Sequence, residues 1–180
     1  AALKSKSGKI GVLNRADSPQ SIEENTAFND GLRAVKADIL VTNVTFDSSN
    51  SKKIVSNYAD VFRKSGVDLI FNNCGPMGLD VYKWAASNNI MMIGSVDDQY
   101  YLAPSIVLTS VQINYEKMLG FALEQMMRGQ WQGSLYRFGM AEKVTDIAPL
   151  RGILNASQEE VFYEIYKEIA SQKGEVFERI

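Results

Sequence analysis

Short apolar runs alternate with longer amphipathic segments through the first part of the chain. The apolar runs are typical of buried strands and lie at 9–14, 38–46, 67–73 and 90–96. Between them, apolar residues recur at helical spacing over 22–35, 52–66 and 78–89. Strands that alternate with helices in this way form right-handed βαβ units. The pattern therefore predicts an α/β fold, with a doubly wound parallel sheet between two helical layers.

The alternation loosens after Tyr100. An extended run at 100–112 precedes a long predicted helix at 113–130, whose apolar stripe includes Met118, Leu123 and Met126 or Met127. Because methionine adapts its shape to irregular gaps, we expect these methionines to fill a core.

Two weaker segments and one strong helix end the chain. The stretch 134–140 predicts a strand, and 144–154 is irregular or short-stranded. The helix at 157–174 has Ser157 as its expected N-cap, Glu160 as the partner in a capping box, and Gly174 as its terminator.

The predicted sheet places a distinct set of residues at one edge. Ligands of doubly wound sheets bind beyond the carboxyl ends of the strands. Those ends carry Asn14, Phe46, the glycine stretch NNCGPMG at 72–78 and the stretch SVDDQ at 95–99. Glycines allow a backbone to approach a ligand closely. Phe46 is either a residue at the edge of the core or a stacking platform for a flat ligand.

Composition narrows the chemistry. The 180 residues are 46% hydrophobic, enough for one ordinary core, and the net charge of −2 disfavours nucleic acid as a partner. The chain has no histidine and one cysteine, which removes the commonest proton shuttle and the usual zinc ligand sets. We therefore expect no metal-ligating set of residues, although a carboxylate-only magnesium or calcium site without EF-hand spacing stays open. We expect Cys74 to be a small buried thiol.

Familiar catalytic and phosphate-binding motifs do not occur. There is neither GxGxxG nor GxxxxGK[ST], so no nucleotide cofactor is predicted. Asp97 and Asp98 are neighbours whose side chains point to opposite sides of an extended chain. One of them either faces a ligand hydroxyl or caps the next segment. An enzyme acting through Asp97, Asp98 or Cys74 stays an alternative, although no base and nucleophile are arranged together.

Several separated stretches together resemble a known family. They are GKIGVL followed by DSP, then TFDS, VDLIF with CGPMGLDV, IGSVDDQYYLAPSIVLTSV, RGQWQG and IASQKGEV. They resemble the basic-membrane-protein family of extracytoplasmic solute-binding proteins, which includes nucleoside-binding lipoproteins of bacterial ABC importers. The match runs along nearly the whole chain, and DDQYYLAPSIVLTS is its most specific part.

The resemblance implies a type I periplasmic-binding fold, in which two α/β lobes enclose a purine nucleoside. The chain would be the C-terminal part of such a protein, a fragment without most of the first lobe. Residues 1–107 would form the ligand-binding domain of the second lobe. Residues 108–180 would hold the crossover segment and the helix that returns to the second lobe. The protein would be non-catalytic, with a membrane permease and an ATPase as partners and a lipid anchor outside this segment.

The resemblance also assigns ligand-binding positions. Phe46 matches the aromatic residue that stacks on the base, and Gly75, preceded by Cys74, matches the glycine loop beside the ligand. Asn14 stands where the family usually has the first of two paired glycines.

Other positions depart from the family pattern. Val96 stands in place of the acid that takes the sugar hydroxyls, with Asp97 one residue away, and Ile113 replaces an expected lysine. These departures, with Arg15 in place of the second glycine, favour a second reading, a sensor or regulatory protein with an altered pocket.

Overall fold

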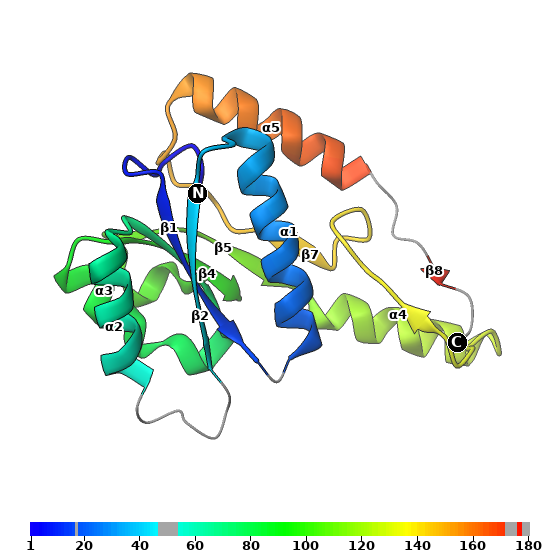
Figure 1. Ribbon diagram of the computed structural model, residues 1–180. Helices are drawn as coiled ribbons and strands as arrows, with labels where there is room; N and C mark the ends of the chain where they lie inside the picture. Colours follow the sequence, from blue (N-terminus) through cyan, green and yellow to red (C-terminus); the bar gives the residue numbers. More distant parts are fainter. Residues whose placement is uncertain (17, 47–53, 172–175, 178–180) are drawn as a thin grey trace.

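The computed structural model describes residues 1–16, 18–46, 54–171 and 176–177 (Figure 1). Its first half contains β1 (Lys9–Arg15), α1 (Pro19–Val35), β2 (Leu40–Phe46), α2 (Ile54–Ser65), β3 (Leu69–Asn73), the 3-10 helix η2 (Gly75–Gly78), α3 (Asp80–Ser87) and β4 (Met91–Val96). Its second half contains the 3-10 helix η3 (Gln99–Leu102), β5 (Val107–Ile113), α4 (Tyr115–Met127), β6 (Leu135–Tyr136), β7 (Thr145–Ile147), α5 (Ala156–Ser171) and β8 (Val176–Phe177).

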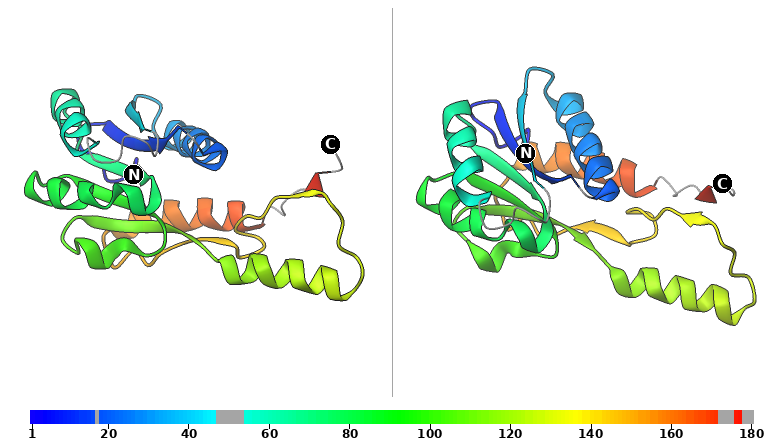
Figure 2. Two further views of the ribbon diagram at one scale, coloured as in Figure 1. Left: turned by 90° about the horizontal axis from the view of Figure 1, so that it is seen from below. Right: turned by 60° about the horizontal axis from the view of Figure 1, so that its bottom comes forward.

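One sheet of six strands organises the molecule, in the order β2-β1-β3-β4-β5-β7. Every pair is parallel except β5 and β7, which are antiparallel. Helices α2 and α3 cover one face, and α1 and α5 lie over the other (Figures 1 and 2). The predicted doubly wound α/β fold with three layers is confirmed.

Each face of the sheet has its own apolar core. Under α2 and α3, Phe62 and Tyr82 pack with strand residues such as Ile70. Under α1, Leu32 packs with Val12 and neighbouring residues. Because both faces of the sheet are covered, the strands are apolar on both sides, which is why they read as continuous runs in the sequence.

Helix α4 extends away from the sheet (Figure 2). Its inner side places the Phe121 ring 5.4 Å from that of Tyr136 and 5.1 Å from that of Phe138. No α4 residue is buried, and Met126 and Met127 are 53% and 88% exposed. The expectation that these methionines fill a core is therefore wrong for this chain, because nothing in the described residues covers that side of the helix.

Helix α5 begins earlier than expected. Asn155 Oδ1 accepts from the Gln158 backbone N–H at 3.0 Å, and Gln158 Oε1 accepts from the Asn155 N–H at 3.1 Å. The reciprocal capping box is thus formed by Asn155 and Gln158, and the expected pair of Ser157 and Glu160 is wrong because Ser157 already lies inside the helix. The expected terminator, Gly174, lies outside the described residues.

The two weaker segments form short strands. Of the stretch 134–140, only β6 is a strand, and it pairs with β8. The stretch 144–154 contains β7, which returns antiparallel along β5 and pairs Thr145 with Ile113. This return brings residues 143–146 back to the carboxyl end of the parallel sheet.

Candidate functional site

An asparagine ladder lies at the carboxyl edge of the first strands. Asn14 on β1 is opposite Asn73 on β3, and both side chains are buried. Asn14 Nδ2 donates to Asn43 Oδ1 at 3.1 Å, and Asn73 Nδ2 donates to the Ser21 carbonyl at 2.8 Å. Ser21 belongs to the first turn of α1, so these bonds fix the N-terminal end of that helix at the strand ends. Asn14 is therefore held in place, with its amide engaged by its neighbours.

Phe46 ends β2 at the same edge, where its backbone is opposite Arg15. Its side chain lies outside the described residues, so its stacking role stays a prediction.

Cys74 is buried beside the glycine loop, as predicted, with 2% of its surface exposed. Burial raises the pKa of the thiol to about 12, although the positive charge of Arg15 acts in the opposite direction. The thiol is therefore protonated at neutral pH, and a protonated thiol is a poor nucleophile. This geometry gives no support to catalysis through Cys74.

Gly75 and Val96 bring two neighbouring strand ends together. Gly75 opens η2 with φ +54°, and a Cβ added to it would lie 3.5 Å from Val96 Cγ2. Val96 itself has φ +77°, a conformation that a β-branched residue rarely adopts. Such strain persists where the surrounding structure imposes it, which is common at ligand-binding sites.

A network of buried polar side chains lies next to these two strand ends. Asn72 Nδ2 donates to the Tyr82 hydroxyl at 3.5 Å, and that hydroxyl donates to Gln99 Oε1. Gln99 Nε2 in turn donates to the Ser95 carbonyl at 3.0 Å, and the Gln99 backbone N–H donates to Ser110 Oγ at 3.0 Å. The network joins the ends of β3 and β4 to the middle of β5 and so fixes the loops that follow β3 and β4.

A polar cavity of about 500 Å³ begins where β4 ends. Val96 and Asp97 line one side, Gln112 and Ile113 of β5 line the floor, and the first turn of α4 contributes Lys117. The remaining lining comes from Asn114, Tyr115, Glu116, Lys143, Val144 and Asp146. The cavity therefore offers both carboxylates and ammonium groups to a ligand.

Asp98 has a structural role. Its carboxylate accepts from the Tyr100 backbone N–H at 3.2 Å, which caps η3, and it forms an ion pair with Arg151. The two acids point in different directions, because Asp97 faces the cavity and Asp98 faces Arg151. The capping alternative is therefore correct for Asp98, and Asp97 stays the candidate for contact with a ligand.

Sequence reasoning missed Lys117 and Lys143. The expected lysine was sought at position 113, whereas Lys117 lies one helical turn further on and lines the same cavity as Ile113. Asn114, whose side chain accepts from the Lys117 N–H at 3.0 Å, caps α4 directly after β5. That cap was the available signal, since it places the first turn of α4 at the end of the strand.

A second cavity of about 400 Å³ lies on the α1 side of β5. Glu23 and Glu24 line it from α1, and Arg137 lines it from the segment after β6. Arg137 forms an ion pair with Glu23 at 3.3 Å, which ties that segment to α1. Partial burial raises the pKa of Glu24, while a hydrogen bond from Gln20 acts the other way.

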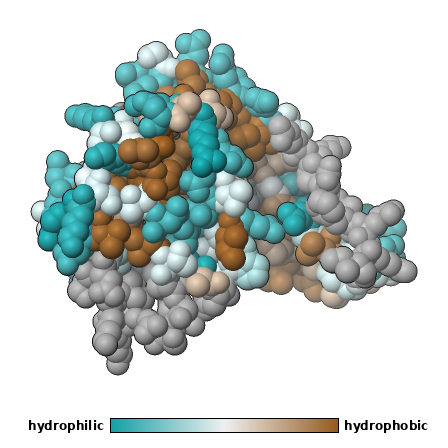
Figure 3. Space-filling view, viewed as in Figure 1, coloured by the Kyte–Doolittle hydropathy of each residue, from teal (hydrophilic) through white to brown (hydrophobic). Residues whose placement is uncertain are grey.

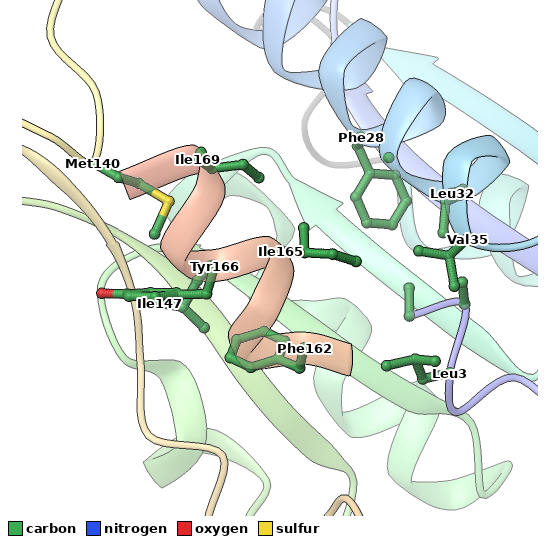
Figure 4. A pocket seen from close by; sticks show the side chains of 13 residues that line it. Leu3, Phe28, Leu32, Val35, Met140, Ile147, Phe162, Ile165, Tyr166 and Ile169 are labelled. Atoms are coloured by element: carbon green, nitrogen blue, oxygen red, sulfur yellow. The ribbon is translucent and has the colours of Figure 1, made fainter. Parts of the chain in front are cut away.

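An apolar cavity of about 270 Å³ lies elsewhere, between α1 and α5 (Figure 4). Phe28 and Leu32 line it from α1, and Phe162 and Ile165 line it from α5. Hydrophobic side chains also gather on this face of the molecule in the space-filling view (Figure 3). Ligand sites combine apolar walls with several polar groups that orient the ligand. Tyr166 is the one polar side chain in this lining, so the polar cavity is the better candidate.

The described part of the chain holds neither a cluster of metal-binding side chains nor a membrane-spanning helix. No group of three or more histidine, cysteine or acidic side chains there could hold a metal ion. No described helix is both long enough and apolar enough to span a bilayer.

The fold and the strand-end site together define a lobe of the kind found in solute-binding proteins of ABC transporters. A solute-binding protein from Conexibacter woesei superimposes with a TM-score of 0.68 at 13% identity, covering 94% of this chain and 57% of that one. A protein from Bacillus halodurans described as a transcriptional activator of the comK gene superimposes with a TM-score of 0.78 at 17% identity, covering 96% of this chain and 60% of that one. At these identities the superpositions establish the fold.

Residues 1–179 match the Bmp family, described as ABC transporter substrate-binding protein PnrA-like, and the chain belongs to that family. It is 24% identical to basic membrane protein A of Borreliella afzelii over 99% of this chain and 54% of that protein. It is 25% identical to basic membrane protein B of Borreliella burgdorferi over 96% of this chain and 50% of that protein. The chain thus spans about half the length of these curated relatives, and the predicted family is confirmed.

Proposed function

We propose that the chain is the ligand-binding portion of an extracytoplasmic solute-binding protein that encloses a small molecule and delivers it to an ABC permease and its ATPase. The observation that carries the proposal is the meeting of Gly75, Val96 and Asp97 at the strand ends, beside a cavity of about 500 Å³. The family of the chain supports the transport role.

The proposed ligand is nucleoside-like, with each rim residue given one task. Phe46 would stack on the base, and Gly75 would allow the backbone to approach it. Val96 supplies no acceptor for sugar hydroxyls, so Asp97 would accept a hydroxyl. A charge-assisted hydrogen bond of that kind contributes roughly 1.5–3 kcal/mol. Lys117, which lines the same cavity as Asp97, would donate to another polar group of the ligand.

The proposal includes two lobes. Residues 1–107 would form one of them, and 108–180 would hold the crossover and the returning helix. Helix α4 supports this division, because Leu119, Leu123 and Met127 are 65%, 59% and 88% exposed on it. Contiguous exposed apolar side chains usually mark an interaction surface. We propose that the other lobe covers them, and that a lipid anchor outside these residues holds the protein at the membrane.

The binding would leave the ligand chemically unchanged. The chain contains no histidine, and the pKa of its single thiol is raised by burial. The chain therefore has no histidine to act as a general base, and its thiol stays protonated and is a poor nucleophile.

The test is calorimetry, on a preparation that contains both proposed lobes, with adenosine, inosine and their free bases. We expect saturable binding that Phe46→Ala weakens by roughly tenfold or more and Asp97→Asn by a similar factor, as the loss of one stacking or charge-assisted contact implies. Asp60→Asn, an exposed change on α2, is the matched control. Binding that neither site variant alters would refute the residue roles, and a complete lack of nucleoside binding would refute the ligand class.

A sensor or regulatory protein of the same fold is the second candidate. It is favoured by Val96, Ile113 and Arg15, which depart from the family pattern, and by the superposition on the protein described as a transcriptional activator. A survey of neighbouring genes separates the two. Permease and ATPase genes beside this one support import, and their absence supports the sensor.

A further inference from the structure

An ion pair joins α1 to the segment between β6 and β7. Arg137 Nη2 donates to Glu23 Oε1 at 3.3 Å, and Arg137 Nη1 donates to Glu23 Oε2 at 3.5 Å. The guanidinium and the carboxylate thus meet in a bidentate arrangement, which fixes their relative orientation. The two residues are 114 positions apart in the chain, so the pair depends on how two separate segments lie relative to each other.

Arg137 directly follows β6 and belongs to a unit formed by α4 and β6, the α4–β6 unit, which extends away from the sheet (Figure 2). The chain enters this unit after Ile113, the last residue of β5, and returns to the sheet at Thr145, the first residue of β7. The two connections lie side by side, since the Asn114 N–H donates to the Val144 carbonyl at 2.6 Å. Two adjacent connections of this kind can act as a hinge.

Glu23 lies at the edge of the sheet where the proposed ligand binds. Helix α1 begins at Pro19, shortly after β1 ends, so its first turns lie at the carboxyl ends of the strands. Glu23 and Arg137 both line the cavity of about 400 Å³, which has α1 on one side and the α4–β6 unit on the other. The ion pair therefore bridges this cavity, and it can form only while its two sides are close together.

We propose that the Glu23–Arg137 pair is a latch that favours the closed arrangement of the two lobes, in which the ligand is held. The inference rests on the proposed function, because that function assigns α1 to one lobe and the α4–β6 unit to the crossover toward the other. Arg137 and Glu23 are 50% and 64% exposed, so the pair is weak and screened by salt. A weak latch suits a protein that must open again to release its ligand.

The first experiment measures the arrangement without ligand, by pulsed electron paramagnetic resonance on a preparation that contains both proposed lobes. Spin labels at Ala27→Cys on α1 and Gln132→Cys in the α4–β6 unit, both exposed positions, are placed in a Cys74→Ala background. We expect Glu23→Arg and Arg137→Glu each to lengthen or broaden the distance distribution, since each reversal sets like charges against each other. The double variant, which reverses the pair, should restore the original distribution.

The second readout is nucleoside affinity by calorimetry. Only the closed fraction of the protein holds the ligand, so each single reversal should weaken the affinity by about two- to fivefold, and the double variant should regain it. Asp60→Arg is the matched control. It breaks the similarly exposed pair of Asp60 and Arg63 on α2, and it should change neither the distance nor the affinity.

A distance distribution that neither single reversal alters overturns the latch, and so does a double variant that fails to restore it. A nucleoside affinity that the single reversals leave unchanged overturns it as well. Because the distances are measured without ligand, they test the latch even in a protein that binds no nucleoside, a result that would refute the ligand class alone.

Discussion

Arg151 pairs with Asp98 and places its guanidinium over the ring of Tyr100, 4.1 Å from the ring centroid. The two side chains of the ion pair are only 28% and 27% exposed. Asp98 caps η3, and Asp97, its neighbour, faces the polar cavity. The segment after β7 therefore fixes the loop that presents Asp97.

Replacement of Arg151 by alanine should destabilise the fold by about 1–2 kcal/mol, because it removes a partly buried ion pair and a cation–π contact together. The stability of Arg151→Lys should lie between that of the wild type and that of Arg151→Ala, since lysine keeps the charge without the planar stacking surface. Urea unfolding measures both changes. The matched control is Arg63→Ala. Arg63 pairs with Asp60 at 62% and 65% exposure, so its loss should cost less than about 0.5 kcal/mol. Equal effects at the two sites would contradict the prediction.

The helices and strands were predictable because both have strong periodic patterns, but the cap of α5 was not. Both Asn155 to Gln158 and Ser157 to Glu160 have the spacing of a capping box. A tertiary contact favours the first, since Gln158 Nε2 also donates to the Leu3 carbonyl at 2.7 Å. Local sequence cannot report a bond between residues so far apart.

The candidate site, too, was predictable only in part. The strand-end rule located Asn14, Gly75 and Val96, because it depends only on the order of strands and helices. Lys143 reaches the cavity through the antiparallel return of β7 along β5, and no local pattern encodes that pairing. Likewise, the apolar stripe of α4 predicts a helix with one apolar face, without indicating what covers that face.

Gly78→Ala should destabilise the protein by about 1–3 kcal/mol, the usual effect of overpacking. A Cβ at Gly78 would overlap the amide of Asn72, which is fully buried beneath the loop and held by Tyr82. The amide has no room to move aside without loss of that bond. Chemical denaturation measures the change, and a variant as stable as the original protein would show that the loop adjusts freely.

Gly31→Ala should have the opposite effect and stabilise the protein by about 1 kcal/mol. Gly31 lies inside α1, and a Cβ there would meet no atom within 4 Å. Alanine favours the helix over glycine by about this amount, because the unfolded chain loses less entropy. The same denaturation assay applies. A loss of stability here would mean that the space beside Gly31, in the apolar cavity, is needed by another group.

Val96→Asn tests the strain at the end of β4. Val96 has φ +77°, which costs a β-branched residue about 1–3 kcal/mol, and asparagine tolerates this conformation better. Some apolar contact with the Gly75 region is lost, so the expected net gain is small, about 0.5–1 kcal/mol. A stabilised variant with weaker ligand binding would indicate that the strain serves the site. A clearly destabilised variant would show that the valine side chain is needed for packing.

Cys74 gives a prediction for alkaline pH. Its folded pKa is raised by burial from its ordinary value of 9.0 to about 12, against an opposing effect from Arg15. The unfolded chain therefore loses the thiol proton first as the pH rises, and stability falls between about pH 9 and 12, while below pH 9 the contribution is fully present. The pKa values of Tyr58 and Tyr82 are also raised by burial, so wild-type stability should fall further than Cys74 alone explains. The difference in unfolding free energy between wild type and Cys74→Ala isolates the thiol, and it should shrink as the pH rises above 9.

Reaction of Cys74 with a thiol reagent should be slow in the folded protein and fast in urea. Rapid labelling of the folded protein at neutral pH would show that the thiol is accessible and reactive, contrary to the buried geometry.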